Sequence, residues 1–110
     1  MDFQQVYLVT TVPEVHLSAV LEAIASAGAG IIGRYTHCSF SLAGSGRFKP
    51  DSDAQPAVGE REQINTEREI RIETFCPREQ VRAVTAALRA AHPYEEPIIY
   101  LLPMVNEADF

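Results

Sequence analysis

Hydrophobic and polar residues follow two different patterns along this chain, and the order of the patterns predicts a fold. Three segments are rich in β-branched and aromatic side chains, as strands are: residues 6–12, 67–76 and 98–102. Residues 14–27 and 78–91 instead repeat apolar side chains every three or four positions, which indicates helices that bury one side. Pro13 and Pro77 each stand where a strand gives way to a helix, because the first turn of a helix tolerates the missing N–H.

A further strand is predicted for residues 31–42, where side-chain character alternates with a period of two. The face expected to join the core carries Ile32, Arg34, Thr36, Cys38, Phe40 and Leu42. The other face is polar and carries Tyr35, His37, Ser39 and Ser41. His37 and Cys38 are therefore expected to point apart, which disfavours a metal site built from this pair. In the strand 67–76, Ile70, Ile72, Thr74 and Cys76 should point inward and Glu69 outward.

Glycine and proline interrupt these patterns between residues 43 and 63, which predicts one long loop. Connections of this length inside a compact domain are usually functional or disordered. The glycine N–H groups of Gly44 and Gly46, next to Phe48, offer contacts to an anion, although the segment lacks the lysine and the helix of a P-loop. A flexible glycine turn explains the segment equally well.

The element order is strand, helix, strand, strand, helix, strand, which predicts an α+β, ferredoxin-like βαββαβ domain over residues 1–110. Its four-stranded antiparallel sheet has the spatial order 4-1-3-2, with both helices on one face. The other face and the two edge strands remain open. Burial of such surfaces between copies is common, so we expect a homo-oligomer.

Residues 91–97, Ala-His-Pro-Tyr-Glu-Glu-Pro, place the most reactive groups of the chain between a helix and a strand. The topology puts this motif and the Gly44–Gly46 segment at the same end of the sheet. Because they adjoin the two outer strands, about 14 Å apart, we expect them to meet only across a subunit boundary. Glu95 and Glu96 should point to opposite sides of an extended backbone, with one of them paired to Arg71 or Arg34.

The candidate ligand-binding residues are Tyr35, His37, Gly44, Gly46, Phe48, His92, Tyr94, Glu95 and Glu96. A small molecule or a divalent metal ion is the expected ligand, and His37, His92 and Glu95 carry the groups suited to a metal. An alternative for His92 is that its ring caps the last carbonyls of the second helix. No catalytic residue is assigned.

Composition narrows the classes of partner. The chain has 110 residues, 46% of them apolar, with nine basic and fifteen acidic side chains and a pI near 4.9. This negative balance argues against nucleic acid and anionic membranes as partners. Neither a basic, apolar leader nor an apolar segment long enough for a bilayer is recognisable, so we expect a cytoplasmic protein. Cys38 and Cys76 lack Cys-x-x-Cys spacing and are interpreted as small buried hydrophobes.

Four segments in this order resemble a known family: residues 34–40, 44–50, 69–73 and 91–97. They resemble the YqfO-type insert domain of the Nif-three-like dinuclear-metal hexamer family, which also occurs as short standalone proteins. The resemblance implies a CutA/PII-like subunit of ferredoxin-like fold that commonly trimerises. Longer relatives are labelled as a type of GTP cyclohydrolase, with a two-metal centre in a flanking domain. Because the residues here match only the insert, neither that centre nor the cyclohydrolase label is expected to apply.

Three functions therefore remain open. The first is a trimeric binding or sensing module, in which Tyr35 and His37 of one subunit face His92 and Tyr94 of another. The second is a structural or adaptor oligomer without a ligand, in which loss of His92 lowers the melting temperature rather than ligand occupancy. The third is an enzyme using His92 and Glu95 as acid and base, which no nucleophile motif or cofactor fingerprint in the sequence supports.

Overall fold

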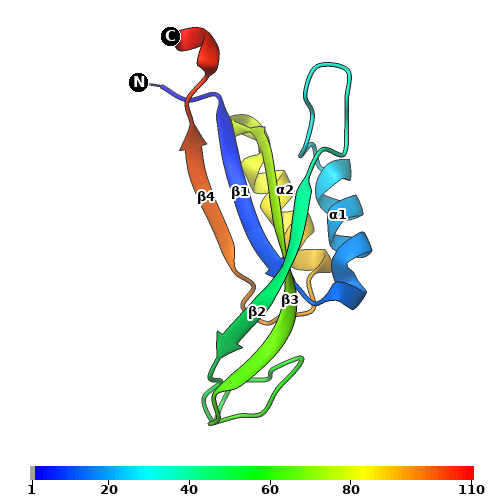
Figure 1. Ribbon diagram of the computed structural model, residues 1–110, viewed down its shortest axis with the longest axis vertical. Coiled ribbons are helices and arrows are strands. Elements are labelled where there is room, and N and C mark those ends of the chain that lie inside the picture. The colour runs from blue at the N-terminus through cyan, green and yellow to red at the C-terminus, as the bar shows by residue number, and fades with distance from the viewer. Residues whose placement is uncertain (1) are drawn as a thin grey trace.

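The computed structural model describes residues 2–110 as a four-stranded antiparallel sheet with two helices on one face (Figure 1). The elements are β1 (Gln5–Val12), α1 (Leu17–Ser26), β2 (Phe40–Phe48), β3 (Asn65–Pro77), α2 (Val81–Ala91) and β4 (Ile99–Met104). The strands lie in the order β2-β3-β1-β4. The predicted ferredoxin-like βαββαβ fold and its 4-1-3-2 sheet are confirmed.

The strand-to-helix junctions form as expected. Pro13 and Pro77 each precede a single 3₁₀ turn, Glu14–His16 and Arg78–Gln80, that leads into a helix. At its other end α1 stops before Gly28, whose φ of 113° favours a residue without a side chain. Within residues 2–110, neither helix combines the length and the apolar character that a bilayer crossing requires.

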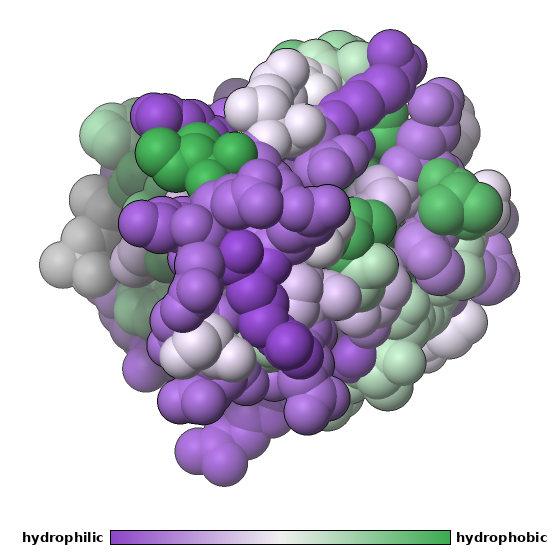
Figure 2. Space-filling view, turned by 90° about the horizontal axis from the view of Figure 1, so that it is seen from below, coloured by the Kyte–Doolittle hydropathy of each residue, from purple (hydrophilic) through white to green (hydrophobic). Residues whose placement is uncertain are grey.

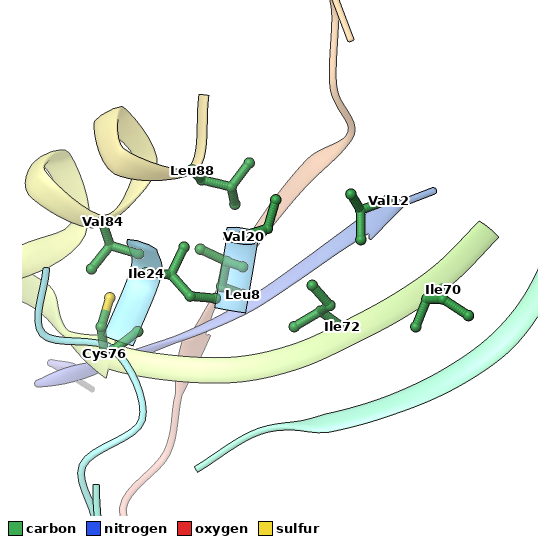
Figure 3. Packing of buried hydrophobic residues seen from close by; sticks show 10 residues of the cluster. Leu8, Val12, Val20, Ile24, Ile70, Ile72, Cys76, Val84 and Leu88 are labelled. Carbon is green, nitrogen blue, oxygen red and sulfur yellow. The ribbon is translucent and has the colours of Figure 1, made fainter. Parts of the chain in front are cut away.

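The core lies between the sheet and the two helices (Figure 3). Its buried members are Leu8, Val12, Val20, Ile24, Ala29, Ile70, Ile72, Cys76, Val84 and Leu88. In β1 and β3 they occupy alternate positions that the register places opposite one another, such as Val12 and Ile70. Truncation of one such side chain to alanine typically costs about 2–5 kcal/mol of stability. The predicted inward face of β3 is confirmed.

The predicted boundaries of the second strand are wrong. Residues 31–39 form a turn, in which Ile32 and Tyr35 exchange backbone hydrogen bonds of 3.0 and 2.8 Å and His37 has a φ of 60°. The strand β2 begins only at Phe40 and pairs with β3 along its whole length. Phe40 and Leu42, predicted to be core, are 65% and 42% exposed on the face opposite the helices. Alternation alone does not reveal whether a segment has a pairing partner.

The position of the loop changes accordingly. Because β2 continues to Phe48, the connection to β3 covers residues 49–64 instead of 43–63. Gly44 and Gly46 therefore belong to a paired strand, where they oppose Glu69 and Glu67 of β3. The interpretation of these glycines as a flexible, anion-binding turn is wrong.

Candidate functional site

A cavity of about 550 Å³ lies where the β2–β3 hairpin, the loop 49–64 and the segment that leads into β4 come together. This is the lower end of the molecule in Figure 1, and Figure 2 shows the same end as a mainly hydrophilic surface with separate hydrophobic patches. The charged residues that line the cavity are Arg47, Lys49, Asp51, Asp53, Glu69, Glu95 and Glu96. Its apolar lining includes Phe48, Pro50, Pro56, Val58 and Ile98.

The cavity brings predicted site residues together within one chain. Gly46 and Phe48 line it together with Tyr94, Glu95 and Glu96, so these groups do not need a subunit boundary to meet. The expectation that they meet only between subunits is wrong, because the long loop folds back over the end of the sheet. The backbone N–H of Gln55 in that loop donates to Glu95 Oε1 over 3.2 Å.

Both adjacent glutamates face this cavity. Residues 95 and 96 form a bend, so the extended backbone from which Glu95 and Glu96 were predicted to point to opposite sides is absent. The predicted ion pair of one glutamate with Arg71 or Arg34 is also wrong: Arg71 lies 3.3 Å from Glu73 on its own strand, and none of the ion pairs within residues 2–110 involves Arg34. Glu96 is exposed at the rim.

Glu69 is the residue that the pattern analysis missed. It was predicted to point outward, and it does lie on the face opposite the helices, yet only 6% of it is exposed. Its carboxylate lies over Gly46, where a Cβ atom would overlap it. A glycine within a strand often marks such a close approach. The signal in the sequence was thus the pair of strand glycines, which the analysis had placed in a loop.

His92 links the segment after α2 to β1 by its side chain and is only 7% exposed. Its Nε2 lies 2.7 Å from the carbonyl oxygen of Thr11 in β1, and its Nδ1 accepts a hydrogen bond of 3.1 Å from the N–H of Tyr94. These two partners fit a neutral ring with the proton on Nε2. Burial lowers the pKa of His92, against the opposing effects of the Thr11 hydrogen bond and the Glu69 carboxylate. The alternative prediction for His92, in which its ring caps the last carbonyls of the second helix, is wrong.

The Tyr94 hydroxyl is buried, and within residues 2–110 only the Glu69 carboxylate lies where it can accept the hydroxyl proton. Its ring packs against that of His92 at 4.9 Å between centroids. Burial raises the pKa of Tyr94, and the nearby Glu69 carboxylate raises it further. The phenol therefore keeps its proton at neutral pH and remains a donor.

Tyr35 and His37 lie away from this cavity, in the turn that Figure 1 shows at the opposite end of the molecule. The His37 side chain is 58% exposed and its Nε2 lies 3.6 Å from Glu22. His37 and Cys38 both line a smaller cavity of about 270 Å³ beside α1, so the prediction that they point apart stays untested. The segment is a turn, to which strand alternation does not apply.

Metal ligands do not converge within one chain. Among residues 2–110, no three His, Cys, Asp or Glu side chains are placed to share a metal ion. His92 uses both ring nitrogens internally, whereas His37 is at the other end of the molecule. A site formed by His37, His92 and Glu95 thus stays a prediction that requires contact between two subunits.

Several longer proteins are similar in sequence to this chain. The GTP cyclohydrolase 1 type 2 homolog of Halalkalibacterium halodurans is 41% identical over 102 residues, which cover 93% of this chain and 27% of that protein. The Bacillus subtilis protein of the same description is 40% identical over 97 residues, or 88% of this chain and 26% of that protein. The chain thus spans about a quarter of the curated relatives it matches and corresponds to an insert-like domain of them. No family model matches the chain.

Solved structures agree with this correspondence. The Bacillus cereus protein related to NIF3 superimposes with a TM-score of 0.79 and 37% identity, over 96% of this chain and 27% of that one. CutA1 from Shewanella sp. SIB1 superimposes with a TM-score of 0.70 and 16% identity, over 96% of this chain and 86% of that one. The second likeness shows a shared fold only. The predicted resemblance to a Nif-three-like insert domain and to the CutA/PII-like fold is confirmed.

Proposed function

We propose that this chain, a homologue of an insert-like domain of the GTP cyclohydrolase 1 type 2 homologs, is an oligomeric binding module that holds a small ligand in the cavity beside Glu69. The relatives' name describes proteins of which this chain spans about a quarter, so the proposal rests on the cavity. The observation that carries it is a carboxylate on a buried residue, Glu69, that faces the buried Tyr94 hydroxyl at the cavity and has no cationic partner among the ion pairs of residues 2–110. Buried polar groups in native proteins are normally hydrogen-bonded, so this pair favours a ligand between them.

The structural alternative applies to one residue of the same motif. His92 has both ring nitrogens bonded and is a rigid link between β1 and the residues that shape the cavity. We therefore assign His92 to positioning and Tyr94 to contact with the ligand. An acid–base role for His92 with Glu95 has no comparable support, because the ring would have to break one of its two hydrogen bonds before it could exchange a proton with a substrate.

Oligomerisation is the second part of the proposal. The sheet face opposite the helices exposes Phe40, Leu42, Tyr100 and Leu102, between 42% and 65% each. Exposed apolar side chains gathered on one face of a small protein often lie at an interface. We propose that further copies of the chain cover it, as a trimer, in a cytoplasmic protein. The two cysteines are free, as is usual in a reducing compartment.

The oligomer is tested by light scattering on size-exclusion fractions of the wild type and of Leu102→Glu. A charge in a buried interface costs several kcal/mol, so the variant should elute as a folded 12.1 kDa monomer while the wild type elutes as a multiple of that mass. Val105→Glu, which adds the same charge at an exposed apolar residue beyond β4, is the control. A monomeric wild type contradicts this part of the proposal.

The ligand site is tested by thermal-shift measurements with a chemically diverse set of small metabolites. Gly46→Ala places a methyl group against the Glu69 carboxylate, whereas Gly44→Ala, on the same face of β2, has open space around its Cβ. We expect at least one compound to raise the melting temperature of the wild type and of Gly44→Ala, but not that of Gly46→Ala. Equal shifts in all three proteins would place binding elsewhere.

A further inference from the structure

The charges around the cavity are unbalanced. Five carboxylates and two basic side chains line it. Two of the carboxylates are engaged with the loop: Asp51 Oδ1 accepts from the N–H groups of Asp53 and Ala54, both at 2.9 Å, and Glu95 accepts from Gln55. None of the ion pairs within residues 2–110 involves Arg47 or Lys49. The cavity therefore presents an excess of negative charge to a ligand.

Glu69 is the member of this set that most requires a partner. Only 6% of the residue is exposed, and none of the ion pairs of residues 2–110 includes it. The Tyr94 hydroxyl is the one donor within the described chain that faces its carboxylate, and both groups line the cavity. A buried carboxylate is stable only when a positive or donor group compensates for lost water. Tyr94 supplies a neutral donor, so the occupant of the cavity should supply the positive group.

The chemistry of the two polar groups restricts the occupant further. An ionised carboxylate only accepts hydrogen bonds, and an ammonium or guanidinium group only donates them. Such a cation can donate to Glu69 and to the Tyr94 oxygen, while the Tyr94 proton stays available to a carboxylate. An anion would be repelled, and a neutral molecule would leave the charge of Glu69 uncompensated.

The size and the apolar lining of the cavity make a single metal ion a poor fit. A volume of about 550 Å³ lies in the range of small-molecule sites and greatly exceeds that of one ion. Phe48 and Ile98 contribute apolar surface beside the acidic groups. This arrangement suits a cationic head on an apolar stem, because the stem is buried while the head is paired.

We propose that the cavity binds an organic cation, an ammonium or guanidinium group on an apolar stem, whose charged head lies between Glu69 and Tyr94. This inference rests on the proposed binding function and specifies its ligand class. The same chemistry is available from a free amine or guanidine and from an arginine side chain of a second copy.

The test is isothermal titration of the purified protein with butylguanidinium and butylammonium, compared with 1-butanol, butyrate and zinc chloride. We expect binding of one or both cations, weaker or absent binding of the others, and a loss of at least tenfold in affinity for Glu69→Gln. Tyr94→Phe should lose affinity by a smaller factor. Glu73→Gln, the same charge change on the same face of β3, should bind as the wild type does.

Each other result has a defined meaning. Butanol or butyrate binding as tightly as the cations, or Glu69→Gln binding them unchanged, overturns the cation assignment. If a noncationic compound binds the wild type and is lost in Gly46→Ala, the binding function stands and only its ligand class is wrong. If no class of probe binds in the cavity, the proposed function itself fails.

The source of the cation is decided in the same samples. Dissociation of the oligomer by saturating butylguanidinium, or a monomeric Glu69→Gln variant, assigns the cation to an arginine of a second copy. An unchanged oligomer with butylguanidinium bound assigns it to a free small molecule.

Discussion

The two ends of the sheet contain similar reactive side chains in different environments. At one end His92 is 7% exposed, with both ring nitrogens bonded, beside the buried Glu69 carboxylate. At the other end His37 also lies near a glutamate, Glu22, but the two side chains are 58% and 73% exposed. An exposed pair of this kind contributes little to stability or affinity because water and salt screen it. Burial and missing partners, rather than residue type, distinguish the candidate site.

The largest expected effect comes from removal of the His92 ring. His92→Ala leaves the Thr11 carbonyl and the Tyr94 N–H without their partners and opens a void, so we expect a loss of about 2–4 kcal/mol in the free energy of unfolding. His37→Ala is the matched control and should stay within about 0.5 kcal/mol of the wild type. Urea unfolding measures both. Equal losses for the two variants would abolish the distinction between the two ends.

A smaller effect is expected where β2 crosses Glu69. Gly46→Ala forces the buried carboxylate to move and should cost about 1–3 kcal/mol, as overpacking does. Gly44→Ala meets no neighbour and should be neutral or stabilising by about 0.5 kcal/mol, because alanine restricts the unfolded chain. Urea unfolding again provides the measurement. A neutral Gly46→Ala would show that Glu69 has room to move and is not held over the glycine.

The smallest effect is a dependence on pH. The folded-state pKa of His92 is lowered by burial, so the unfolded chain binds the proton more readily and stability falls as the pH drops below the ordinary histidine value near 6.5. One such group changes the free energy of unfolding by at most about 1.4 kcal/mol per pH unit. The nearby charges act in both directions, since Glu69 favours the protonated ring and His16 opposes it.

His92→Gln keeps a donor toward Thr11 without a titrating ring, so its stability should decline less between pH 7.5 and 5.5 than that of the wild type. Urea unfolding at three pH values in this interval compares the proteins. A steeper decline in His92→Gln would show that the ring is not the titrating group.

The fold could be predicted from the sequence because each core element buries apolar side chains that recur regularly along it. The helix α2 and the strand β3 each carry apolar residues at the period of their own geometry, and both were located correctly. The prediction for residues 31–48 was wrong for a physical reason. Side-chain alternation marks an extended chain but not its pairing partner, and β2 lies at an edge of the sheet where none of its residues is buried.

The candidate site could be predicted only in part. The motif 91–97 was recognised by its chemistry, and Tyr94, Glu95 and Glu96 do line the cavity. Glu69 was missed because an alternating glutamate on a strand is normally solvated. In the structure Gly46 lies against its carboxylate and Tyr94 faces it, and these contacts join segments far apart in the chain.

The most direct test of the account is native mass spectrometry of the wild type, Glu69→Gln and Glu73→Gln, freshly purified. The account predicts an oligomer of 12.1 kDa subunits, with an added small mass that is present in the wild type and in Glu73→Gln but absent from Glu69→Gln. Wild-type protein that carries no added mass, and takes up none from the cationic probes, would contradict the claim that the cavity beside Glu69 is a ligand site.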